Sequence, residues 1–70
     1  MKKIIRKFKS KAEANKFKEE VLMRNIPGLT AQTYMRIGKP VCMVATREDM
    51  SEELYENLLG GQKNLAECAR

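Results

Sequence analysis

Polar and apolar positions alternate from Leu29 to Ile37, the clearest periodic stretch of the chain. Odd positions hold apolar or small side chains, whereas the even positions include Tyr34 and Arg36. A period of two places successive side chains on opposite faces of a strand. We therefore predict a strand whose odd positions face the core and whose Tyr34 and Arg36 point away from it.

Two further strands are predicted on either side of this segment. Residues 41–46 are almost continuously apolar, which is typical of a central strand, and Gly38-Lys39 is the expected two-residue turn that leads into them. Residues 2–9 mix branched and aromatic side chains with lysines, a composition that suits an edge strand.

Two amphipathic helices are also predicted. The first begins at Ser10, which forms a capping-box pattern with Glu13, and ends near Arg24. The second begins at Asp49, the best of three candidate N-caps, and ends at Gly60-Gly61. The other candidate N-caps are Thr46 and Ser51. The apolar stripe of the first helix comprises Ala14, Phe17 and Val21, and Leu22 widens it. The stripe of the second helix comprises Met50, Leu54 and Leu58 together with Tyr55 and Leu59.

These elements predict a single α+β domain of βαββα order. A helical crossover makes the first two strands parallel, so the third strand can lie between them and pair antiparallel with both. The expected sheet order is therefore 1-3-2, with both helices on one face, and the layout resembles a ferredoxin-like split βαβ that lacks its sixth element. Residues 1–60 form this compact domain, and residues 61–70 form a flexible or short-helical C-terminal extension.

Charge is distributed unevenly along the 70 residues, which carry a net charge of +5. Residues 1–18 contain eight Lys or Arg against Glu13 alone, whereas residues 49–70 contain two against five acids. A basic segment of this kind attracts phosphate groups. Most of the cations are lysines, which favour point-charge phosphate contacts over base-specific readout.

Residues for catalysis or metal binding are scarce. The chain has no histidine, and Cys42 and Cys68 lie too far apart in sequence to form a close-spaced ligand pair. We expect no catalytic residues, no metal and no cofactor. The low cysteine content suits a reducing cytoplasm, and the longest apolar run, residues 41–45, is far too short to span a membrane.

The first functional hypothesis is a non-catalytic module that binds single-stranded or non-specific nucleic acid. Its basis is the cation-rich N-terminal strand and first helix, to which two later arginines add charge. The predicted phosphate-binding residues are Lys2, Lys3, Arg6, Lys7, Lys9, Lys11, Arg36 and Arg47.

The alternative hypothesis is a stoichiometric regulator or inhibitor that binds one protein partner, or a second copy of itself, through the open face of the sheet. With Gly38-Lys39 as the turn, Tyr34 lies opposite Met43, and Arg36 lies opposite Val41. We predict that Tyr34, Val41 and Met43 form an exposed, largely apolar patch on this face, rimmed by cations.

Overall fold

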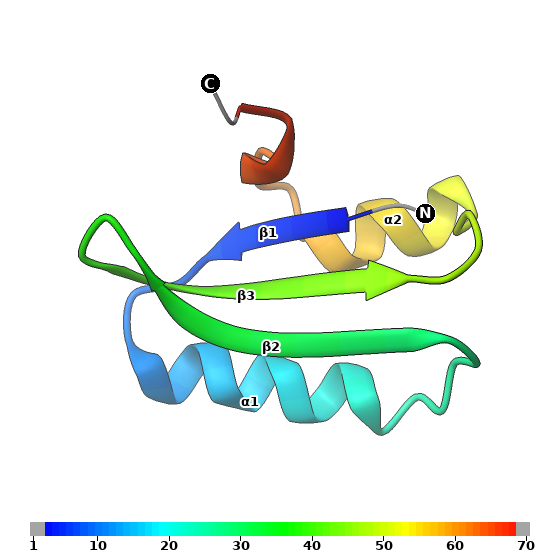
Figure 1. Cartoon of the computed structure of the whole chain (residues 1–70), viewed down its shortest axis with the longest axis horizontal. Coiled ribbons are helices and arrows are strands. Elements are labelled where there is room, and N and C mark those ends of the chain that lie inside the picture. The colour runs from blue at the N-terminus through cyan, green and yellow to red at the C-terminus, as the bar shows by residue number, and fades with distance from the viewer. Residues whose placement is uncertain (1–2, 69–70) are drawn as a thin grey trace.

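The computed structural model describes residues 3–68, which fold as a three-stranded sheet with two α-helices and a short 3-10 helix (Figure 1). In chain order the elements are β1 (Lys3–Lys7), α1 (Lys11–Leu22), β2 (Leu29–Arg36), β3 (Lys39–Thr46), α2 (Glu52–Leu59) and the 3-10 helix η1 (Leu65–Cys68). The βαββα arrangement is confirmed. No helix within residues 3–68 is both long and apolar enough to cross a membrane.

The sheet has the order β1-β3-β2, and β3 pairs antiparallel with both neighbours, as predicted. Pro40 stands at the start of β3, where β1 ends. Its carbonyl oxygen accepts a hydrogen bond from the backbone N–H of Phe8 at 2.9 Å, but proline has no N–H to return. Pairing between β1 and β3 therefore stops at this point, and the chain turns toward α1.

The predicted hairpin register is wrong by two residues. Tyr34 lies opposite Val41, and Arg36 lies opposite Lys39, so Ile37-Gly38 forms the turn. Both turn residues have positive φ, 50° at Ile37 and 76° at Gly38, as the common two-residue hairpin turn requires. A shift of two keeps every strand residue on its predicted face, but it removes Ile37 from the strand. That side chain is 93% exposed.

Local capping chemistry fixes the helix boundaries. The Ser10 hydroxyl accepts from the backbone N–H of Glu13, and the Glu13 carboxylate accepts from the N–H of Lys9, which confirms the predicted start of α1. The N-cap of α2 is Ser51, whose hydroxyl accepts from the N–H of Leu54, so the choice of Asp49 is wrong. An N-cap side chain normally accepts from the backbone N–H two or three residues later, and Ser51 stands three residues before Leu54.

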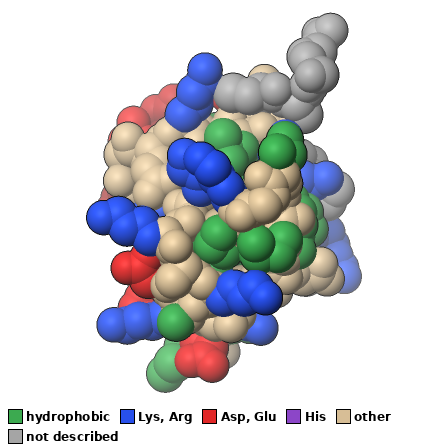
Figure 2. All heavy atoms as spheres, turned by 90° about the vertical axis from the view of Figure 1, so that its left-hand side faces the viewer, with side chains coloured by type: hydrophobic (Ala, Val, Ile, Leu, Met, Phe, Trp, Pro, Cys, Tyr) green, Lys and Arg blue, Asp and Glu red, His purple; other side chains and the backbone are tan. Residues whose placement is uncertain are grey.

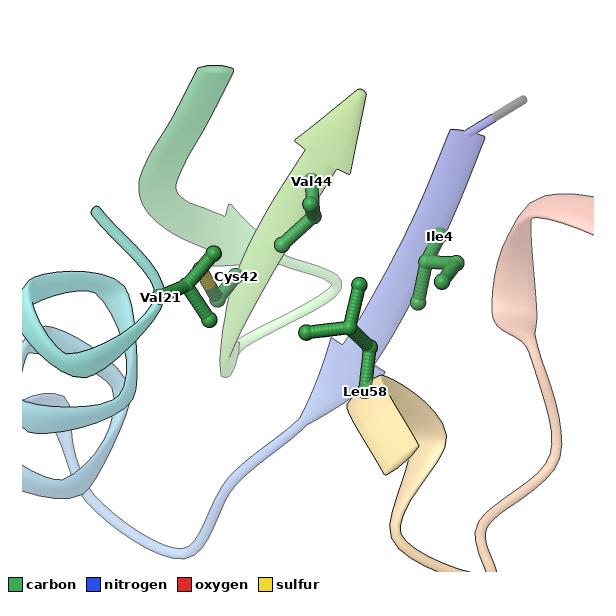
Figure 3. Close-up of a cluster of buried hydrophobic side chains, with 5 residues drawn as sticks. All are labelled: Ile4, Val21, Cys42, Val44 and Leu58. Atoms are coloured by element: carbon green, nitrogen blue, oxygen red, sulfur yellow. The ribbon is translucent and has the colours of Figure 1, made fainter. Parts of the chain in front are cut away.

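Five buried side chains form the core between the sheet and the helices (Figure 3). They come from four elements and comprise Ile4, Val21, Cys42, Val44 and Leu58. The predicted stripe residues Phe17 and Leu54 are only partly buried and pack around this cluster. Both helices therefore cover the same face of the sheet, as the two apolar stripes require.

The opposite face of the sheet is partly covered near β1. Val41 lies on this face and is 1% exposed, which contradicts its prediction as part of an exposed patch. The cause is η1, which packs against β1 and places Leu65 in the same hollow as Val41. Residues 61–70, predicted as a flexible or short-helical extension, thus contain a 3-10 helix, and residues 69–70 lie outside the described part.

Asn64 attaches this segment to the free edge of β1. Its side-chain oxygen accepts from the backbone N–H of Ile5 at 3.0 Å, and its side-chain nitrogen donates to the carbonyl of Lys3 at 3.1 Å. A residue of a parallel neighbouring strand would make the same two contacts opposite Ile4. The Asn64 side chain is 4% exposed, so it replaces part of a missing strand in a buried setting.

Replacing Asn64 tests this attachment. We expect Asn64→Ala to lower the free energy of unfolding by about 1–3 kcal/mol, because the buried N–H of Ile5 loses its acceptor. Asn57→Ala is the matched control, since Asn57 is exposed and donates only to Glu53 within its own helix. Urea denaturation measures both variants, and equal stability would show that Asn64 contributes nothing specific.

Candidate functional site

Five cationic residues gather where the β2–β3 turn, the end of β1 and the start of α1 meet. We call this region the hairpin end and define it as residues 7–13 and 34–41. Lys7 lies at the end of β1, across β3 from Tyr34 at the end of β2, so the registers bring these segments together. The cations are Lys7, Lys9, Lys11, Arg36 and Lys39, and Glu13 is the one acidic residue in these ranges.

Apolar and aromatic side chains lie among these cations. Tyr34 and Met35 are about half exposed, and Ile37 at the tip of the turn is almost fully exposed. Figure 2, which looks at this end of the molecule, shows hydrophobic side chains with Lys and Arg above and below them. A β-branched residue with positive φ costs about 1–2 kcal/mol. The fold therefore holds an apolar side chain in solvent at an energetic cost.

A hollow of about 280 Å³ opens on the sheet face of the hairpin end. Its lining residues are Lys7, Arg36, Ile37, Lys39, Val41 and Leu65. The guanidinium Nη1 of Arg36 donates to the carbonyl oxygen of Leu65 at 3.4 Å, so η1 holds Arg36 at the rim. Three cations thus surround an apolar floor, an arrangement suited to a ligand with both anionic and apolar parts.

Arg6, predicted as a phosphate-binding residue, lies on the other face of the sheet from the hollow lined by Lys7, Arg36 and Lys39. Its side chain points to the helix-covered face, where the guanidinium carbon lies 5.1 Å from the Phe8 ring centroid and 4.9 Å from that of Phe17. Its Nη1 donates to the carbonyl of Leu58 at 3.2 Å. A Cβ on residue 60 would come within 2.9 Å of this guanidinium, so Gly60 leaves room for it. Arg6 is half-buried, and its guanidinium packs against Phe8, Phe17 and the end of α2.

The other predicted phosphate-binding residues are divided between the two ends of the sheet. Lys7, Lys9, Lys11 and Arg36 lie at the hairpin end. Lys3 and Arg47 lie at the opposite end, because Lys3 pairs with Ala45 and Arg47 follows the end of β3. Lys2 falls outside the described residues. The structure thus brings together four of the eight predicted residues.

Lys39 is the basic residue that the prediction omits. It pairs with Arg36 directly beside the turn and is exposed. In the predicted register Lys39 is a turn residue with no cross-strand partner, so the prediction does not place it beside Arg36. The sequence did offer this alternative, because Ile37-Gly38 can also form a two-residue turn with glycine at its second position. That turn makes Lys39 the first residue of the following strand.

The predicted protein-binding patch is smaller than expected. Tyr34 is 40% exposed, as predicted, whereas Val41 is buried and Met43 is half-buried between Ile5 and Gln32 on the neighbouring strands. Because η1 covers the β1 side of this face, its accessible apolar surface is confined to the β2 side and the turn.

Cys42 is buried in the core, and burial raises the pKa of its thiol above the ordinary value of 9.0. Nearby positive charge from Lys18 and Arg6 opposes this effect without overcoming it. Nucleophilic chemistry requires the thiolate, so a buried thiol with a raised pKa suits a structural role. Within residues 3–68, no group of three or more His, Cys, Asp or Glu side chains is placed to hold a metal ion.

No protein-family model, curated protein or solved structure matches this chain. A functional assignment therefore depends on the chemistry of its surface.

The raised pKa of Cys42 predicts a pH dependence of stability. The unfolded thiol ionises first as pH rises, so the folded state retains more protons and loses stability above about pH 9, until its own higher pKa is reached. We expect this loss in a Cys68→Ser variant followed by denaturation at increasing pH. Adding Cys42→Ala should remove this component of the slope, and an unchanged slope would contradict the assignment.

Proposed function

We propose that this protein is a non-catalytic module that binds single-stranded nucleic acid through the hairpin end. The observation that supports the proposal is the presence of five cations at the hairpin end together with exposed Tyr34, Met35 and Ile37. Three of these cations, Lys7, Arg36 and Lys39, line one hollow with Ile37. Phosphate groups would contact the lysines, and a base would stack on Tyr34. A free core thiol at Cys42 suits a reducing compartment such as the cytoplasm.

The lysine-rich composition supports binding without strong sequence preference. Four of the five cations are lysines, which act as mobile point charges, whereas bidentate base recognition favours arginine. The one arginine, Arg36, already donates to the carbonyl of Leu65. Tyr34 provides a π-face that any base can use. Affinity would therefore depend on strand length and salt more than on sequence.

The salt dependence of binding tests the phosphate contacts. Five contacts predict a slope of log K against log salt of about −3.5 for a single-stranded oligonucleotide, since each contributes about −0.7. The double variant Lys7→Gln, Lys39→Gln should reduce the slope to about −2.1, because two contacts are lost. Fluorescence anisotropy of a labelled oligonucleotide measures both values.

The matched control for this test is the double variant Lys3→Gln, Arg47→Gln, which removes equal charge at the far end of the sheet. Its slope should stay close to that of the wild type. If both variants lower the slope equally, net charge controls binding and the hairpin end does not. A flat salt response of the wild type would reject phosphate binding altogether.

Tyr34 tests the stacking contact separately. Tyr34→Ala should weaken oligonucleotide binding about tenfold or more, because one base loses about 1–3 kcal/mol of stacking. Tyr34→Phe keeps the aromatic face and should bind like the wild type. Both variants should unfold within about 1 kcal/mol of the wild type, since Tyr34 is 40% exposed. If Tyr34→Ala and Tyr34→Phe bound the oligonucleotide equally well, stacking on Tyr34 would contribute nothing and the affinity would come from electrostatics alone.

A second candidate function is binding to one protein partner. The observation that favours it is the free outer edge of β2, which forms one border of the sheet along eight residues. An edge of this length is a template for another extended chain. This candidate does not require catalysis.

A further inference from the structure

The two outer edges of the sheet differ in what covers their backbone groups. At the β1 edge, the Asn64 side chain occupies the Lys3 carbonyl and the Ile5 N–H, and η1 lies beside the strand (Figure 1). At the β2 edge, no element of residues 3–68 pairs with the strand. Exposed edges promote association unless they are blocked, so the contrast identifies β2 as the edge available for strand pairing.

The outward-facing groups of β2 follow from the position of Pro40. Its carbonyl oxygen accepts from Phe8, so the backbone of residue 40 points toward β1. Residue 40 pairs with Met35, which must then be a non-hydrogen-bonded pair, with the N–H and carbonyl of Met35 directed away from β3. By alternation the same holds for Ala31 and Thr33. None of these backbone groups has a hydrogen bond within residues 3–68.

Helix α1 runs alongside this open edge and forms a groove with it. The groove, of about 250 Å³, lies between the first turns of α1 and the hairpin end of β2. Its lining residues are Lys11, Ala14, Asn15, Thr33, Tyr34, Met35 and Pro40. The hydroxyl of Thr33 donates to the side-chain oxygen of Asn15 at 2.8 Å, which fixes the helix against the strand at the floor of the groove.

The charges along α1 define the chemistry of a ligand in this groove. The helix face of Asn15, which contacts β2, also holds Lys11, Lys18 and Glu19. Glu13 and Glu20 line a hollow on the β1 side of α1. Lys18 also lies close enough to Cys42 to act on its thiol electrostatically. Among residues 3–68, Lys11 is the one charged residue that lines the groove beside β2, so the charge at the groove itself is positive.

We propose that the β2 edge binds an extended, acidic peptide segment by adding it to the sheet as a fourth strand. The N–H and carbonyl groups of Ala31, Thr33 and Met35 would supply the ladder, and Lys11 would pair with a carboxylate of the peptide. A second copy of this chain is disfavoured as the occupant. Pairing β2 with itself would bring two chains of net charge +5 together.

A proline substitution tests strand addition without altering the side-chain chemistry of the hairpin end. Thr33→Pro removes an outward N–H and places a ring where the added strand would lie, yet takes no hydrogen bond from the β2–β3 ladder. Thr33→Ala is the matched control, because it loses the contact to Asn15 but keeps the N–H. The probe is a labelled peptide of alternating glutamate and valine that spans the eight residues of β2.

We expect the wild type and Thr33→Ala to bind this peptide alike and Thr33→Pro to bind it about tenfold or more weakly. In the wild type, hydrogen exchange followed by NMR should show new protection at the amides of Ala31, Thr33 and Met35 when the peptide is added. This second measurement decides the question even if Thr33→Pro unfolds. Equal binding by the two variants, or no new protection, would overturn the proposal.

Further measurements distinguish an acidic peptide from the other possible ligands. A peptide in which lysine replaces each glutamate should bind far more weakly, and equal binding would reject the acidic ligand. Sedimentation of the wild type should show a monomer, whereas a dimer abolished by Thr33→Pro would make a second copy the occupant. A single-stranded oligonucleotide should bind Thr33→Pro and Thr33→Ala equally, so failure of the nucleic-acid proposal remains distinguishable from failure of this one.

Discussion

Burial of β3 on both of its faces is the constraint on which the other elements depend. Cys42 and Val44 contact the helices, while Val41 points to the opposite face and is buried as well. A strand of this kind needs a neighbour on each edge and a cover on each face. The strands β1 and β2 supply the neighbours, α1 and α2 cover one face, and η1 covers part of the other. Within residues 3–68, the part of this face beside β2 stays uncovered.

Much of this fold could be predicted from sequence periodicity. The alternation in residues 29–36 and the apolar run that follows indicated the hairpin and its central strand, and the capping pattern at Ser10 indicated α1. These signals are local, since each arises within a few residues. The register failed because Ile37 adopts a positive φ, which β-branched residues rarely do, so the pattern favoured Gly38-Lys39.

The candidate site was harder to predict, because it depends on contacts between distant residues. Arg6 belongs to the basic N-terminal stretch, but its position on the covered face of β1 directs it toward Phe8 and Phe17. No sequence pattern around Asn64 indicates that it hydrogen-bonds to the edge of β1. The burial of Val41 in turn depends on η1, the segment that follows Asn64. Sequence reasoning identified the charge of the surface, but folding determined which charges share a face.

The contacts of Asn64 impose an order on folding. Asn64 and Lys3 are separated by 61 positions, so β1 obtains the contacts at its outer edge only after β2 and β3 have been synthesised. Until then β1 has no pairing at its outer edge, and before β3 is made it has no partner at all. Contacts of such long sequence separation form slowly, because the intervening chain must be ordered. β1 therefore stays incompletely paired until Asn64 has been synthesised, and a ribosome-bound intermediate would expose its outer edge to chaperones and other nascent chains.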